Sequence, residues 1–231
     1  ANQGLTRPEL ATITAYGKMV LKEQLITDEI TEAPYHMREL FDSFPEALRE
    51  SFADSMTSHP LKGQIIATKL ANNIVNDMGP NFVFRKQEAT GASYAEIASA
   101  YVVARECFKV EELWEQIEAL NNKVPAEVQN DVLFQLRRMV RRATRWFLRH
   151  RNPALSGVQE HLHFYMGAFD DLRKNSLKYM VEEEAKVIEQ SIEKYKEHGF
   201  PANLAKQVAS LSTVFSAMDL AEVANETGQS W

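Results

Sequence analysis

The chain has 231 residues, with 26 Lys and Arg against 32 Asp and Glu, a formal net charge of −6 and one cysteine. Hydrophobic residues make up 45% and charged residues 25%, which are ordinary values for a globular protein and exclude a disordered or collagen-like chain. The negative charge argues against a general nucleic-acid binder, whose electrostatic footprint would be basic. A single cysteine cannot form an internal disulfide, which is typical of a protein from a reducing compartment.

The sequence carries no membrane or secretory signal. Its start lacks the basic segment followed by an apolar one that a secretory signal has. The longest stretch without a charged residue, 207–218, has 12 residues, which is too short to span a bilayer. We therefore expect a cytoplasmic protein with no membrane partner. Because the chain starts at Ala1 and reaches a helix cap at Thr6, we also expect it to be part of a longer polypeptide.

Capping residues and apolar periodicity predict a helical chain. Thr6 with Glu9, and Ser93 with Glu96, form capping boxes at two helix starts. Helices are expected over 6–24, 35–41, 45–56, 60–78, 93–108, 111–120, 125–149, 159–175 and 176–197, with two short ones to about 224 and a loop at 152–157. The best strand candidate, 82–84, is too short for a sheet. The predicted fold class is all-α, an array of about eight to ten helices without a sheet.

Apolar residues at helical spacing predict which faces are buried. These residues are Leu10, Ile13, Gly17, Val20 and Leu21 in the first helix, Ile66, Leu70, Ile74 and Met78 in 60–78, and Ile97, Ala100, Tyr101, Ala104, Cys107 and Phe108 in 93–108. The helix over 125–149 has an apolar side that includes Trp146 and Phe147.

The opposite side of that helix carries six arginines, which we call the arginine stripe. They are Arg137, Arg138, Arg141, Arg142, Arg145 and Arg149. They could bind phosphates, or they could pair with carboxylates of another domain or subunit, which suits the bidentate geometry of arginine. A solvated polar face is the third reading. We favour contact with protein, because the aromatic residues of this helix lie on its apolar side and not among the arginines. Asn72 and Asn76, one turn apart on 60–78, are further contact candidates, since Asn is unfavourable inside a helix.

The other residues of the sequence form no recognisable catalytic, cofactor-binding or metal-binding pattern. The sequence has neither of the glycine-rich patterns that bind nucleotide phosphates, so no cofactor-binding or catalytic residue is assigned. Glu160 and His163 form a single Glu-x-x-His pair, while His161 and His163 point to different sides of a helix and cannot share a metal ion. We expect a surface or interface histidine pair and no metal site. Cys107 is expected to be a buried small hydrophobic residue.

Several runs of the sequence resemble the C-terminal part of the large bacterial NAD-dependent glutamate dehydrogenases. The runs include GLTRPELA at 4–11, AYGK at 15–18, IIAT at 65–68, FVFR at 82–85, NKVP at 122–125 and RATRWFLR at 142–149. They follow in order over 4–150, and a looser match continues to SAMDL at 216–220. Enzymes of this family convert L-glutamate, NAD and water into 2-oxoglutarate, ammonia and NADH.

The resemblance implies a non-catalytic C-terminal helical domain with an architectural, subunit-contact or regulatory role. In this family the substrate lysines and the nucleotide-binding fold lie upstream of the GLTRPELA run, so no catalytic residue maps onto this chain. NAD would then bind the parent enzyme and not this domain, and the chain alone would be inactive. The implied partners are the upstream catalytic domain and other subunits of a homo-oligomer. The alternative is a stand-alone helical regulator that binds nucleic acid through the arginine stripe.

The family motifs also suggest a division of the chain. They concentrate in 1–152, which we expect to form a helical domain, while 153–231 would be a C-terminal helical extension packed on the first part as one domain.

Overall fold

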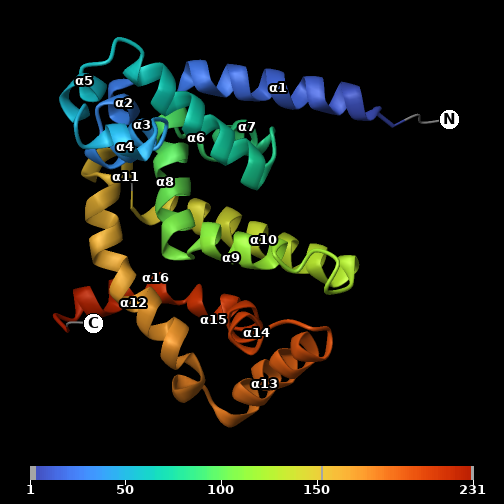
Figure 1. The fold of residues 1–231 in the computed structure, drawn as a ribbon. Coiled ribbons are helices and arrows are strands. Elements are labelled where there is room, and N and C mark those ends of the chain that lie inside the picture. Colours follow the sequence, from blue (N-terminus) through green and yellow to red (C-terminus); the bar gives the residue numbers. More distant parts are fainter. Residues whose placement is uncertain (1–3, 152, 230–231) are drawn as a thin grey trace. The chain divides into compact units, whose positions relative to one another are not determined.

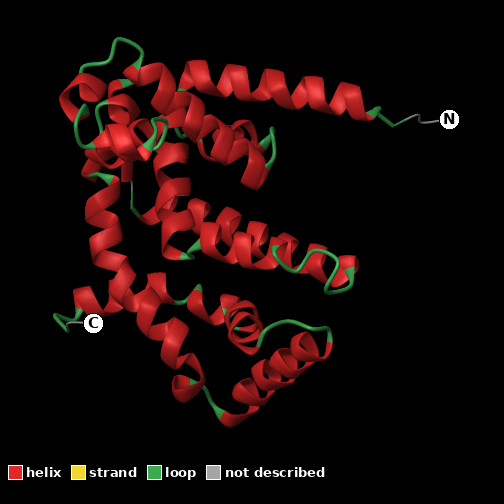
Figure 2. Ribbon diagram, viewed as in Figure 1, coloured by secondary structure: helices red, strands yellow, loops and turns green. Residues whose placement is uncertain are grey.

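The computed structural model describes residues 4–151 and 153–229, and all regular elements among them are helical (Figure 2). The helices are α1 (Arg7–Gln24), α2 (Asp28–Thr31), η1 (Pro34–His36), α3 (Met37–Phe41), α4 (Glu46–Arg49), α5 (Ala53–Thr57), α6 (Lys62–Met78), α7 (Phe82–Thr90), α8 (Tyr94–Cys107), α9 (Val110–Glu118), α10 (Ala126–His150), α11 (Pro153–Ser156), α12 (Val158–Tyr179), α13 (Glu182–Glu197), α14 (Ala202–Ala209), α15 (Leu211–Val214) and α16 (Ala217–Glu226). The all-α class expected from the sequence is confirmed.

The chain divides into two compact units. Unit 1 comprises 1–102 and 144–159, and unit 2 comprises 103–143 and 160–231. Helices α8, α10 and α12 each contribute residues to both units (Figure 1). The sequence-based division into 1–152 and 153–231 follows the extent of the family motifs and stays a prediction.

Unit 1 is organised around α6, which packs against α1, α2, α3 and α7. The face of α6 that periodicity predicted is buried, from Ile66 through Leu70 and Ile74 to Met78. Glycines permit two close approaches. A Cβ at Gly17 of α1 would lie 3.1 Å from the Cβ of Pro80, and one at Gly63 of α6 would lie 3.2 Å from the Thr31 methyl group.

Helix α1 begins as expected but buries less than expected. Thr6 caps it, accepting a hydrogen bond from the Glu9 amide while the Glu9 carboxylate accepts from the Thr6 amide. Only the C-terminal half rests on α6, where Leu21 is buried. The prediction that Leu10, Ile13 and Val20 face inward is wrong, because all three side chains are exposed. Leu10 and Ile13 belong to the N-terminal half of α1, which extends past the rest of unit 1 (Figure 1).

Several predicted boundaries also need correction. Residues 82–84 are no strand but the first turn of α7, whose buried residues Phe82, Val83 and Lys86 lie on one helical side. The helix expected over 45–56 is interrupted between α4 and α5. Helix α12 continues to Tyr179 instead of ending at 175, since Ser176 is buried on its inward side. Pro153 starts the short α11 within the expected loop, and Asn152 lies outside the described residues.

The core of unit 2 is built on aromatic rings. The ring of Phe108 lies 5.0 Å from that of Phe169, edge to face, and 6.4 Å from that of Phe215, stacked. The Tyr165 hydroxyl donates a hydrogen bond to the Glu222 carboxylate, which ties α12 to α16. Lys109, at φ 49° in the left-handed region, turns the chain from α8 into α9. The prediction of a single buried face on α8 is too narrow, because Ala98, Ser99 and Val103 are buried as well.

Across the described ranges, no helix combines the length and the apolar content that a bilayer-spanning segment requires.

His36, where η1 meets α3, is a buried base in unit 1. Its side chain is almost fully buried, and neither ring nitrogen has a hydrogen-bond partner. Burial, reinforced by the positive charge of Arg38, lowers the pKa of His36 from 6.5 to about 4. The neutral imidazole therefore belongs to the folded state, and protonation opposes folding.

His36 is expected to make the fold sensitive to mild acid. Between pH 6.5 and about 4 the unfolded chain binds a proton at this histidine that the folded chain does not, so stability falls as the pH falls. The expected loss from this residue is about 2 kcal/mol between pH 7 and pH 5. Urea unfolding at both pH values should show that His36→Phe removes this loss, whereas His163→Gln, at an exposed histidine, keeps it. An equal loss in all three proteins would contradict the assignment.

Candidate functional site

The arginine stripe lies on α10 as predicted, but its members differ in their surroundings. The guanidinium of Arg137 lies over the Trp114 ring, 4.9 Å from the ring centroid, and that of Arg142 lies over Phe215 at 4.4 Å. Both contacts are made inside unit 2. Trp146 and Phe147, on the other side of α10, are buried as the sequence predicted.

The remaining arginines of the stripe are exposed, namely Arg138, Arg141, Arg145 and Arg149. Glu182, in the acidic run at 182–184, forms its ion pair with Lys186 of its own helix and not with an arginine of the stripe. The structure therefore places two of the six arginines over aromatic rings, while five of the six, Arg142 included, are exposed. Their role in contact with other parts of an enzyme stays a prediction.

The other sequence candidates lie apart from the stripe. Asn72 is half-buried and Asn76 is exposed on α6, and their role in contact with another element also stays a prediction. His161 is not a surface residue as expected, because its ring is buried and stacked against Tyr165, whereas His163 is exposed. Within the part of the chain that the structure describes, no group of three or more His, Cys, Asp or Glu side chains is placed to hold a metal ion.

Cys107 is fully buried, as the sequence predicted. Burial raises the pKa of its thiol far above the usual range, and the nearby Arg173 offsets this only in part. The thiolate that nucleophilic chemistry requires is therefore suppressed.

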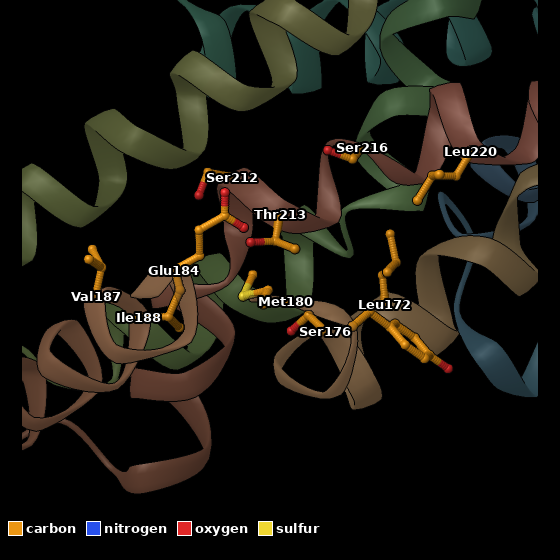
Figure 3. A pocket seen from close by; sticks show the side chains of 11 residues that line it. Leu172, Ser176, Met180, Glu184, Val187, Ile188, Ser212, Thr213, Ser216 and Leu220 are labelled. Atoms are coloured by element: carbon orange, nitrogen blue, oxygen red, sulfur yellow. The ribbon is translucent and has the colours of Figure 1, made fainter. Parts of the chain in front are cut away.

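Unit 2 contains a cavity of about 500 Å³ that no sequence pattern indicated, and we call it the α12–α16 cavity (Figure 3). It is bordered by the end of α12, by α13, and by the segment from α15 to α16. Its lining residues are Leu172, Ser176, Tyr179, Met180, Glu184, Val187, Ile188, Ser212, Thr213, Ser216 and Leu220. A volume of this size, apolar walls and a few converging polar groups are typical of small-molecule sites.

The polar groups of the cavity come from three helical segments. Glu184 of α13 extends toward Ser212 and Thr213, and Ser176 lies between Met180 and Leu172 in Figure 3. Ser176 is fully buried and its hydroxyl has no hydrogen-bond partner. A buried hydroxyl left unpaired costs about 1–3 kcal/mol.

The sequence could not reveal this cavity, because its polar residues are ordinary serines, a threonine and a glutamate scattered over 176–216. Only the folding of α13 back toward α14 and α15 brings them together, a contact seen directly between α13 and α14. A second, smaller cavity of about 260 Å³ lies in unit 1 among Phe44, Leu48, Phe52, Ser55, Met56 and His59, and its lining is almost wholly apolar.

These features define a class of protein: an all-α domain with a cavity in unit 2, whose sequence lacks a glycine-rich nucleotide cradle. The chain belongs to the family described as glutamate dehydrogenase, C-terminal, whose model matches residues 2–231. The resemblance drawn from the sequence runs is thereby confirmed.

Individual relatives agree with the family. The chain is 39% identical over 228 residues to the NAD-specific glutamate dehydrogenase of Halomonas elongata and 38% identical over 230 residues to that of Pseudomonas aeruginosa. In both cases 99% of this chain is covered, but only 14% of the relative. The NAD-specific glutamate dehydrogenase of Mycobacterium tuberculosis is 29% identical over 220 residues, with 95% of this chain and 13% of the relative covered. The chain thus corresponds to one domain of much longer proteins.

The contact between Arg142 and Phe215 should be measurable by a double-mutant cycle. A cation over an aromatic ring at a surface site contributes about 0.5–1 kcal/mol. We expect a coupling free energy of this size from the unfolding of wild type, Arg142→Gln, Phe215→Leu and the double variant. Arg138→Gln, at an exposed position of the same stripe, should show no coupling to Phe215→Leu. Coupling below about 0.3 kcal/mol for Arg142 would show that its guanidinium is not held on the ring.

Proposed function

We propose that this chain is the non-catalytic C-terminal helical domain of a larger NAD-dependent glutamate dehydrogenase, with an architectural role in contacts with the rest of the enzyme. The parent reaction is the conversion of L-glutamate, NAD and water into 2-oxoglutarate, ammonia and NADH. Family membership and the small share of each relative that the chain covers support this proposal. They give no support to a stand-alone nucleic-acid-binding regulator.

The observation that carries the architectural role is the exposed apolar side of α1. Leu10 is 50% exposed, Ile13 46% and Tyr16 64%. Val20 extends the same surface at 46%. Side chains of this kind at helical spacing are typical of a helix that buries one side against a partner. Among the residues of unit 1 that the structure describes, the N-terminal half of α1 extends past the other helices (Figure 1), and its apolar side chains stay exposed.

The occupant we assign to this surface is the remainder of the same polypeptide. The relatives are about seven times longer than the matched region, because the chain covers 14% of them, and the matching family is described as C-terminal. The greater part of such a protein therefore precedes α1 in sequence. Burying three large side chains that are now half-exposed would stabilise the contact by a few kcal/mol, at about 25 cal/mol per Å².

Replacing the apolar side of α1 should weaken the enzyme without unfolding this domain. In the isolated chain, Leu10→Gln, Ile13→Gln and Tyr16→Gln together should change the free energy of unfolding by less than about 1 kcal/mol, since the positions are exposed. In the parent enzyme the same variant should lower the thermal midpoint and expose the α1 region to limited proteolysis. The matched control is Ala11→Gln with Ala15→Gln, on the opposite side of α1. Identical behaviour of both variants in the parent enzyme would overturn the assigned surface.

The purified 231-residue chain should not oxidise glutamate. Absorbance at 340 nm in the presence of L-glutamate and NAD should stay at the level without protein, because no catalytic residue of the family maps onto this chain. Steady NADH formation that persists in preparations from a host without its own glutamate dehydrogenase would contradict the proposal.

A further inference from the structure

The exposed side of α10 changes its charge along the length of the helix. The first two turns carry Glu127 and Asp131 and no base, whereas 132–151 holds seven arginines and no acid. This order of charges suits the helix dipole, but the dipole acts only on the first and last turns. Asp131, Arg138 and Arg141 lie further inside this 25-residue helix. The dipole therefore does not account for the reversal of charge in the middle of α10.

An aromatic ring lies at the point where the charge reverses. Phe134 is 57% exposed, because its position, four residues before Arg138, is on the arginine side of the helix. The expectation that the aromatic residues of this helix lie on its apolar side holds for Trp146 and Phe147 and is wrong for Phe134. Aromatic residues and arginines are the side chains in which protein–protein interfaces are enriched relative to the rest of the surface.

Five residues form a continuous line along this side of α10, which we call the α10 seam. They are Glu127, Asp131, Phe134, Arg138 and Arg141, they follow at alternating intervals of four and three residues, and all are exposed. This spacing keeps side chains on one side of a helix over several turns, and it is the spacing by which two helices pack along each other. The whole seam lies in unit 2.

The order of charges along the α10 seam is complementary to itself when two copies run antiparallel. Asp131 and Arg138 lie three and four residues to either side of Phe134, and Glu127 and Arg141 each lie seven residues from it. Two antiparallel copies that meet at Phe134 therefore place each carboxylate opposite a guanidinium of the other copy. Parallel copies would place like charges together. A two-fold axis across the helix generates the antiparallel arrangement, and two-fold dimers are the commonest oligomers.

We propose that the α10 seam is an interface between two copies of this chain, which pair across a two-fold axis near Phe134. Asp131 of each copy pairs with Arg138 of the other, and Glu127 pairs with Arg141. The two Phe134 rings meet at the axis and lose their exposure to water. This interface goes beyond the architectural role proposed above and does not depend on it, because that role concerns α1 in unit 1.

The contact is expected to be weak and sensitive to salt. One side of one helix is a small interface beside the roughly 1,200–2,000 Å² that stable complexes bury. Its ion pairs lie at the surface, where salt screens them. The isolated chain should therefore show a concentration-dependent equilibrium between monomer and dimer, with a dissociation constant that rises at least threefold between about 0.05 and 0.5 M NaCl.

The test is a charge swap on the 231-residue chain, followed by sedimentation velocity over a hundredfold range of concentration. Asp131→Arg makes the centre of the seam basic and Arg138→Asp makes it acidic, so each variant should weaken dimerisation at least tenfold. An equimolar mixture of the two variants should associate again, and so should the chain that carries both substitutions. This rescue requires the two positions to face each other across copies, which neither a solvated face nor another dimer surface would produce.

Two controls separate the α10 seam from other surfaces. Glu189→Arg makes a comparable charge change at an exposed position of α13 and should leave the dissociation constant within twofold of wild type. Leu10→Gln with Ile13→Gln alters the α1 surface and should also leave it within twofold. Thermal unfolding shows that each variant folds, since all the substituted positions are exposed.

Three results would overturn the proposal. The first is a wild-type chain that stays monomeric up to about 1 mM. The second is a dimer that Asp131→Arg leaves intact or that the α1 variant abolishes, because the contact would then lie elsewhere. The third is a mixture of Asp131→Arg and Arg138→Asp that does not associate, because the two positions would then not be opposed.

Discussion

The burial of one face of α6 is the constraint on which unit 1 depends. Ile66, Leu70 and Ile74 are removed from water only because α1, α2, α3 and α7 all pack on this helix. Two close approaches occur at positions without a side chain, Gly17 of α1 against Pro80 and Gly63 of α6 against Thr31 of α2. The small size of glycine permits these two approaches, and the apolar face of α6 provides the driving force.

Burial by neighbouring helices also explains which apolar side chains remain exposed to water. Helix α1 is longer than the surface that unit 1 offers to it, so its N-terminal half keeps an apolar side in water. In unit 2, α13 packs on α14 but has no fully buried residue, and the space between it and α15 forms the α12–α16 cavity. In both places the sequence supplies apolar side chains that no other described segment of the chain covers. The first is the convex side of a helix, and the second is a concave depression that is open to solvent.

The arginine stripe shows how a uniform sequence pattern acquires different roles. In a helical projection Arg137 and Arg142 lie at the two edges of the stripe on α10, and these two lie over aromatic rings of unit 2, while Arg138 and Arg145 between them face solvent. The partners, Trp114 and Phe215, come from segments 23 and 73 residues away, respectively. A planar guanidinium stacks on whichever ring the tertiary fold supplies, and helical spacing alone contains no information about that ring.

The sequence by itself determined the all-α class, the capping boxes at Thr6 and Ser93, the buried face of α6 and the family to which the chain belongs. These depend on local hydrogen bonds, on the helical repeat and on ordered sequence identity, all of which lie within short stretches of chain. Only the tertiary structure decided that Leu10 and Ile13 are exposed, that His161 is buried, and that Glu184 and Ser176 border one cavity. The physical reason is that a helical period indicates a side that prefers burial, whereas burial itself requires another segment to reach that side. That segment is selected by the packing of residues far apart in the sequence.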